Sequence, residues 1–270
     1  MNKPTICKSC GRLMGTADIC PYCGAKRSSL KTNIIYLKRK ISAPGYSYFN
    51  LILKVTIGMY ILEVLAGMIL MRSGIVETII SGPPGQILYL LGASSPGVFS
   101  HGHWWGPFTA NFLHGGIMHI GFNMFALSQI GPLIEQATTR AFFLFCYLMT
   151  GVGGFLLSAY GGSLSVGASA SLYGLIGCGI VISFILGQGK DDPLFRGLIT
   201  WLIYGIIFSL FFPGIDHLAH LGGLISGLAF GYIWTKMRMV IWFRGLTEKA
   251  SLMLAGATVI GFIHCLVTFL

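Results

Sequence analysis

Polar side chains at three points in otherwise apolar stretches have the types that acyl-transfer chemistry needs. Ser169 follows Gly167 by two residues, and His220 precedes a run of spaced glycines. His119 and Asn123 are four residues apart, so on a helix they point to one face. An imidazole can remove the proton of a serine, and side-chain N–H groups can stabilise the oxyanion that follows. Taken singly, each residue also fits a hydrogen-bonded packing role.

Two acidic residues in or beside apolar stretches are harder to assign. Asp216 lies four residues before His220 and could be a third member of a catalytic group, but its position favours a helix cap. Glu63 lies midway along the first apolar stretch, where an ionisable group is costly and usually functional. The sequence leaves a structural role and a functional role open for Glu63.

The elements that must position these residues are membrane-spanning helices. The chain has 270 residues, of which 54% are hydrophobic and 10% are charged, whereas soluble domains carry about 25% charged residues. A span needs about 20 apolar residues, and continuous apolar runs in lipid are helical. The sequence predicts seven spans, at residues 51–71, 113–134, 141–160, 164–186, 198–212, 215–234 and 252–270.

Basic residues predict how these spans are oriented. The formal net charge is +10, and of the 18 Lys and Arg residues all but Arg72 fall on one side when the N-terminus is cytoplasmic. The positive-inside rule therefore predicts a cytoplasmic N-terminus in the plasma membrane, and topology rather than nucleic-acid binding explains the charge. The first outer loop, residues 72–112, is too apolar for water, so we expect short helices at the outer interface with Trp104 and Trp105 among them.

These spans place the candidate residues at similar depths. Ser169 lies five residues after the predicted start of its span, and His220 lies five residues after the start of its own. At the helical rise per residue, both come about 8 Å below the outer surface. Gly223, Gly227 and Gly231 form a small-residue stripe after His220, which predicts close approach of another helix.

Four cysteines near the N-terminus have metal-ligand spacing. They form two CxxC pairs, each followed by a glycine: Cys7, Cys10, Cys20 and Cys23. Two such pairs can supply four thiolates to Zn²⁺, and a cytoplasmic location argues against the alternative of two disulfides. We expect a structural zinc ion in a small zinc ribbon with an unknown cytosolic partner, and no cofactor for catalysis.

The domain organisation follows from these segments. We expect a zinc-ribbon-like module at residues 1–27, a basic linker at 28–50, a six-helix core at 51–236, and a cytosolic loop with an extra helix at 237–270. The predicted fold is an all-α membrane protein, a bundle of about seven transmembrane helices with the small ribbon at its N-terminus.

The polar segments together resemble bacterial members of the rhomboid family of intramembrane serine proteases. The segments are FLHGGIMHIGFNMFAL, GASASLYGLIG and AHLGGLISG, and the likeness covers residues 51–234. The resemblance implies Ser169 as nucleophile, His220 as base, His119 and Asn123 as oxyanion donors, and Tyr173 and Gly167 as supporting residues. It implies cleavage of transmembrane proteins near the outer face, without nucleic acid as a partner.

The sequence also departs from the family pattern. Ala170 follows the nucleophile where glycine is common, Gly106 replaces the arginine of a Trp-Arg pair in the first loop, and Thr139 replaces a glycine after the second span. None of these changes removes a reacting group. The alternative function is a catalytically inactive rhomboid-like scaffold that binds transmembrane segments, although such relatives usually lack the serine or the histidine.

Overall fold

The computed structural model describes residues 5–6, 13–15, 19, 47–97, 102–162, 164–211 and 214–269. It divides into two compact units, residues Met1–Tyr46 and Ser47–Leu270. In the first unit, strands β1 (Thr5–Ile6) and β2 (Leu13–Gly15) pair in antiparallel fashion. The four cysteines of the expected zinc site lie outside the described residues, so the zinc ribbon stays a prediction.

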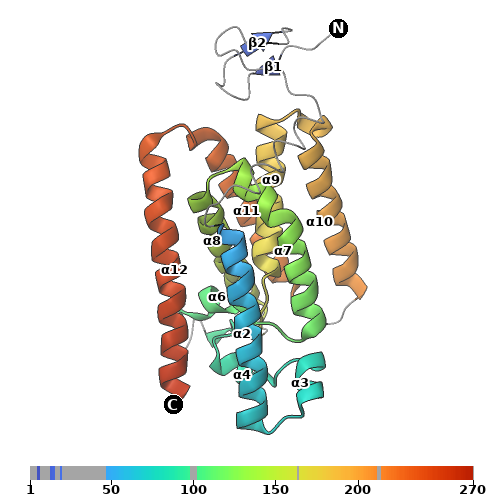
Figure 1. Ribbon diagram of the computed structural model, residues 1–270, viewed down its shortest axis with the longest axis vertical. Helices are drawn as coiled ribbons and strands as arrows, with labels where there is room; N and C mark the ends of the chain where they lie inside the picture. The colour runs from blue at the N-terminus through green and yellow to red at the C-terminus, as the bar shows by residue number, and fades with distance from the viewer. Residues whose placement is uncertain are drawn as a thin grey trace. The chain divides into compact units, whose positions relative to one another are not determined.

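The second unit is a bundle of long apolar helices (Figure 1). Its described residues include seven helices that are long and apolar enough to cross a membrane, which confirms the predicted all-α multi-span fold. They are α2 (Tyr48–Met71), α7 (Ile117–Ala137), α8 (Arg140–Tyr160), α9 (Ser169–Leu186), α10 (Pro193–Phe211), α11 (His217–Met237) and α12 (Ile241–Phe269).

The start of α9 differs from the prediction in a way that matters for the site. The helix begins at Ser169, and Leu164 to Gly167 form an extended segment in which Ser165 pairs with Ser94. Gly167 has a φ of +124°, a conformation that a side chain disfavours and that directs the chain into the helix. The predicted start of this span at Leu164 is therefore wrong. Ser169 instead lies in the first turn of its helix, as His119 and His220 do in theirs.

The helices α9 and α11 touch through their backbones, as the glycine stripe predicted. A side chain at Gly223 would overlap the carbonyl oxygen of Ala170, and one at Gly227 would overlap that of Gly174. An added Cβ at Gly231 would lie 2.6 Å from the carbonyl oxygen of Cys178, which is somewhat less close but still too close for a side chain. Small residues allow such close approach between helices in a membrane. The positions of the two helices are thus fixed by atoms that cannot rotate away.

The helix α8 supplies much of the surrounding core. Its Phe142, Phe143, Tyr147 and Phe155 are among the largest fully buried side chains of the described chain. Thr139 caps this helix, because its hydroxyl accepts a hydrogen bond from the N–H of Phe142 at 3.2 Å. The threonine found in place of a family glycine is therefore used to start α8.

The first outer loop contains short helices, as expected, between α2 and α7. They are α3 (Ile75–Ser81), α4 (Gly85–Leu90), α6 (Gly106–Thr109) and the 3₁₀ turn η1 (Ala110–Phe112); a further 3₁₀ turn, η2 (Gly189–Asp191), precedes α10. Figure 1 shows α4 and α6 beside the C-terminal half of α12, and α10 on the other side of the bundle. The part of the loop that contains α4 and α6 thus packs between the six-helix core and the extra helix, whereas α3 packs against α2 and α7.

Candidate active site

Ser169 and His220 face each other across the closely packed helices α9 and α11. The hydroxyl oxygen of Ser169 lies 2.9 Å from Nε2 of His220. Both side chains are partly buried rather than sealed within the bundle. The two residues are 51 positions apart in sequence, so the contact depends on the glycine-mediated approach of their helices. This distance suits proton transfer from a hydroxyl to an imidazole.

Tyr173 supports the ring of His220. It lies one helical turn after Ser169, and its ring stacks on the imidazole with centroids 4.2 Å apart and planes 15° apart. The Tyr173 side chain is itself buried at 8% exposure. A stacked, buried ring restricts rotation of the imidazole, so that Nε2 stays directed at the serine.

His119 and Asn123 lie over the turn that precedes the serine. An added Cβ at Gly167 would come within 2.7 Å of Nε2 of His119 and 3.8 Å of the amide nitrogen of Asn123. A glycine at residue 167 is therefore needed for space as well as for its positive φ. The structure places His119 and Asn123, the two predicted oxyanion donors, beside the turn at Gly167, two residues before Ser169.

Hydrogen bonds orient these donors. Nδ1 of His119 accepts from the N–H of Gly115 at 3.3 Å, which places the proton of a neutral ring on Nε2, toward Gly167. The amide of Asn123 donates one hydrogen to the carbonyl of His119 at 3.0 Å and keeps a second. The N–H of Ser169 opens α9, where no acceptor of the same helix is available. His119, Asn123 and the start of α9 thus each offer an N–H group close to the turn that precedes Ser169.

Two residues of the site were not assigned by sequence reasoning. Nε2 of His114 accepts from the N–H of Ala168 at 3.3 Å, and the N–H of His114 donates to Glu63 at 3.0 Å. Both side chains are fully buried. Glu63 therefore links α2, through His114, to the turn that precedes Ser169. The only sign of these residues in the sequence is that they are polar in apolar surroundings. Their partners cannot be read from the sequence, because each hydrogen bond joins residues more than 50 positions apart.

Asp216 caps α11 and has no hydrogen bond to the His220 ring. One carboxylate oxygen accepts from the N–H of Ala219 at 2.9 Å, and the other pairs with the hydroxyl of Ser158. Burial raises the pKa of Asp216, but hydrogen bonds from Ser158, Ser165 and Ala219 lower it more, so the pKa lies below its ordinary value. The favoured prediction of a cap is confirmed.

Two departures from the family pattern have local explanations. The methyl group of Ala170 faces Gly154, where an added Cβ would lie only 2.8 Å from it. A glycine on α8 thus provides the space for the alanine after Ser169. Gly106 packs against the backbone of the same loop, since a Cβ there would lie 3.1 Å from the carbonyl oxygen of Ala93. A larger residue at this position would require that backbone to shift by a few tenths of an ångström.

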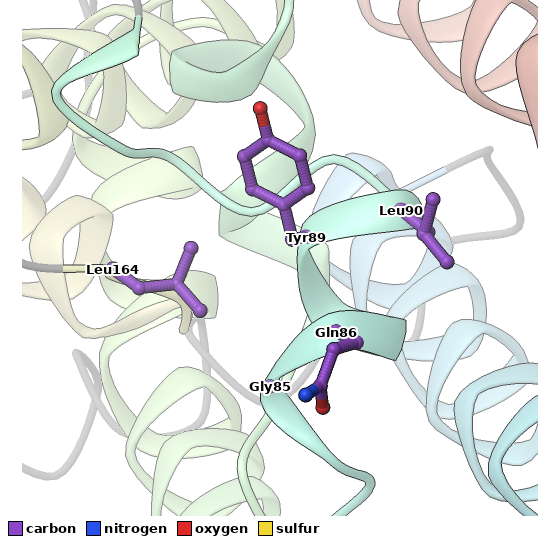
Figure 2. Close-up of a pocket in the computed structure, with 5 residues that line it drawn as sticks. All are labelled: Gly85, Gln86, Tyr89, Leu90 and Leu164. Atoms are coloured by element: carbon purple, nitrogen blue, oxygen red, sulfur yellow. The ribbon is translucent and has the colours of Figure 1, made fainter. Parts of the chain in front are cut away.

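An open hollow of about 760 Å³ lies beside the segment that leads to the serine (Figure 2). Gly85, Gln86, Tyr89 and Leu90 of α4 form one side, and Leu164 faces them from the other. The lining is mainly apolar and does not include Ser169 or His220. The hollow is thus next to Leu164 and not at the hydroxyl of Ser169 or the ring of His220.

Within the described ranges, no group of three or more His, Cys, Asp or Glu side chains is arranged to hold a metal ion. The residues at the site are a hydroxyl, imidazoles, an amide and backbone N–H groups. Such a set can carry out nucleophilic acyl transfer with its own side chains.

Comparison with known proteins places this chain among rhomboid sequences. Residues 101–237 match the Rhomboid domain. The chain is 34% identical over 164 residues to RHOMBOID-like protein 1 of Arabidopsis thaliana, covering 58% of this chain and 42% of that protein. It is 31% identical over 162 residues to Rhomboid-like protease 1 of Toxoplasma gondii, covering 57% and 55%.

A third relative is bacterial. The chain is 30% identical over 146 residues to Rhomboid protease GluP of Bacillus subtilis (strain 168), covering 53% of this chain and 28% of that protein. The matched region spans between about a quarter and a half of the length of these three curated relatives. Relatives occur in three different organisms, so the expected bacterial origin stays a prediction.

Proposed function

Because the chain belongs to the rhomboid family, we propose that it is an intramembrane serine endopeptidase with a Ser169–His220 dyad. The observation that carries this proposal is the 2.9 Å contact between the serine hydroxyl and Nε2 of His220. The multi-pass helical bundle and the N–H groups beside the nucleophile turn support it further.

The first chemical step is acylation. His220 takes the proton of Ser169 as the serine oxygen attacks the carbonyl carbon of a peptide bond. The negative charge that develops on the carbonyl oxygen is stabilised by the ring N–H of His119, the amide of Asn123 and the backbone N–H of Ser169. The N-terminal end of α9 adds a positive dipole at the same place.

The second half returns the enzyme to its starting state. When the tetrahedral species collapses, the C–N bond breaks and His220 gives its proton to the leaving amine. Water then attacks the carbonyl carbon of the acyl-serine, with His220 again as the base. When this second tetrahedral species collapses, the bond to the Ser169 oxygen breaks, His220 returns the proton to that oxygen, and the carboxyl product leaves. The stack on Tyr173 keeps the ring in place for both transfers. A carboxylate third member is not required, and Asp216 serves the helix start instead.

We propose transmembrane proteins as substrates and the outer face of the plasma membrane as the place of cleavage. Ser169, His119 and His220 lie in the first turns of their helices, and Asn123 lies one turn further along α7, so all four are at one end of the bundle. The distribution of Lys and Arg supports a cytoplasmic N-terminus and puts that end outside. The hollow beside Leu164 could receive an apolar side chain of the substrate. Reporter fusions to the loops before α9 and before α10 would test this orientation.

The decisive experiment uses a fluorophosphonate probe and a transmembrane model substrate with the full chain in detergent. Ser169→Ala is expected to lose labelling and to lower cleavage about 10³-fold or more. Ser128→Ala makes the same change on α7, where the hydroxyl bonds its own helix, and is expected to leave both unchanged. Cleavage by Ser169→Ala at the wild-type rate would reject the assigned nucleophile.

The alternative of an inactive scaffold makes a different prediction. A scaffold would bind the transmembrane substrate without labelling or cleavage, and Ser169→Ala would not change that binding. The complete set of reacting groups favours the protease, because a scaffold has no need for a serine within 2.9 Å of an imidazole.

We also propose that Cys7, Cys10, Cys20 and Cys23 hold a structural zinc ion. The support is their spacing and the cytoplasmic side predicted for them. The purified full chain is expected to contain one zinc per molecule, measured by elemental analysis, and Cys20→Ser is expected to lose it. Catalysis as proposed above involves no metal.

A further inference from the structure

The C-terminal half of α12 lies directly against the first outer loop. The ring of His264 packs on that of Trp105, with centroids 4.3 Å apart. One turn earlier, Gly261 leaves space for the same residue, since an added Cβ would lie 2.9 Å from Cβ of Trp105 and 3.0 Å from Cγ2 of Thr109. The extra helix therefore meets the start of α6 at close range, as Figure 1 also shows.

Close to this contact, two distant parts of the first outer loop are joined by a hydrogen bond. Thr109 donates a hydrogen bond to the carbonyl of Gly92 at 2.5 Å. Gly92 has a φ of +99°, and an added Cβ there would lie 3.1 Å from the sulfur of Cys265. The α12 helix thus covers the point at which the two ends of residues 92–109 come together.

The first outer loop is hydrogen-bonded to residues 165–167, which lead into Ser169. The carbonyl of Ala110 accepts from the N–H of Gly167 at 2.9 Å. Ser94 exchanges two backbone hydrogen bonds with Ser165, at 3.0 and 2.8 Å. The turn before Ser169 is therefore hydrogen-bonded at two points to Ser94 and Ala110. These two residues lie next in the chain to the Gly92 and Thr109 region that α12 packs against, so a shift of the loop would move that turn.

A row of rings continues from α12 to the hollow. His103 packs on Trp105 with centroids 5.1 Å apart, and the hydroxyl of Tyr89 lies 2.7 Å from Nδ1 of His103. Tyr89 forms part of the wall opposite Leu164 (Figure 2). The contact at His264 thus reaches both the nucleophile turn and the wall of the hollow.

We propose that α12 is a positioning element for the active site, acting through Gly261 and His264. These residues hold Trp105 and Thr109 in place, and the loop in turn holds Gly167 and Ser165 where Ser169 meets His220. This inference rests on the proposed protease function for its effect on catalysis. The packing of the loop on α12 does not depend on that function and can be measured separately.

The test compares two glycines on one helix. Gly261→Leu would push into Trp105, whereas Gly256→Leu adds the same side chain where nothing lies within 4 Å. At a temperature well below unfolding, Gly261→Leu is expected to slow fluorophosphonate labelling and to lower kcat about tenfold, with a smaller change in KM. Gly256→Leu is expected to match the wild type in labelling, kcat and melting temperature.

A second pair keeps the test valid if Gly261→Leu fails to fold. His264→Ala removes the ring and is expected to slow labelling several-fold, whereas His264→Phe keeps a ring against Trp105 and is expected to restore most of the rate. Hydrogen exchange followed by mass spectrometry is expected to rise in residues 92–112 and 164–168 for His264→Ala but not for His264→Phe. A simple loss of global stability would not be confined to these two segments.

The outcomes separate the two proposals. Wild-type labelling and exchange in both His264 variants, or equal effects of Gly261→Leu and Gly256→Leu, would overturn the positioning role. Probe labelling that persists in Ser169→Ala would instead overturn the proposed nucleophile, and the exchange of residues 92–112 would still report whether α12 holds the loop.

Discussion

The pair α9 and α11 and the neighbouring helix α10 pack in opposite ways. The membrane-spanning window of α9 is 67% buried, whereas that of α10 is 11% buried. The first pair is held by backbone atoms at glycines, but α10 reaches α7 through large side chains, with Phe208 on Phe122 and Trp201 on Phe125. A contact between long side chains can adjust, because the side chains can change rotamer, whereas a contact between two backbones cannot. Ser169 and His220 are therefore carried by the two helices whose contact is the less adjustable.

The largest expected effect comes from a side chain placed between α9 and α11. Gly227→Val would overlap the carbonyl of Gly174, and overpacking typically costs about 1–3 kcal/mol or more. We expect a lower melting temperature and at least a tenfold loss of fluorophosphonate labelling. Gly197→Val on α10 is the control, because nothing lies within 4 Å of that position. Equal melting temperatures for the two variants would contradict the comparison.

A smaller effect is expected at Glu63, where an outer helix bonds to the site. Glu63→Leu leaves the buried N–H of His114 without an acceptor, which costs about 1–3 kcal/mol. Glu63→Gln keeps an amide oxygen for that N–H, so it is expected to retain most of the stability and activity. Unfolding in detergent measures the change in stability of each variant, and cleavage of a model substrate measures the change in activity. An equal loss in both variants would show that the hydrogen bond is not what matters.

The smallest effect is expected at the start of α11. Asp216→Ala removes the cap at Ala219 and is expected to lower the free energy of unfolding by about 1 kcal/mol at pH 7. The folded pKa of Asp216 is lowered, so its stabilisation is full above about pH 4 and is lost as the pH falls through that lowered pKa. Unfolding measured between about pH 5 and pH 3 should therefore show a weaker acid dependence in the variant. Identical acid profiles would contradict this role.

The long elements were predictable because lipid imposes a simple requirement. Each span must satisfy its own backbone hydrogen bonds, so length and apolar composition identify seven helices without further information. The glycine stripe at Gly223, Gly227 and Gly231 also predicted its close contact, since small residues are what backbone approach requires. Helix ends were less predictable. The run from Leu164 is apolar enough for a helix, but pairing with Ser94 and the positive φ of Gly167 delay the start to Ser169.

The sequence by itself determined the residue types, the number of spans and the spacing of His119 and Asn123 on one helix face, because these depend on composition and local periodicity. Only the tertiary structure decided which distant groups meet: Ser169 with His220, Glu63 with the N–H of His114, and Trp105 with His264. Each pair joins segments more than 50 residues apart. Their contact depends on how whole helices pack. The glycine stripe predicted that α11 has a closely packed neighbour, but not which atoms of that neighbour it meets.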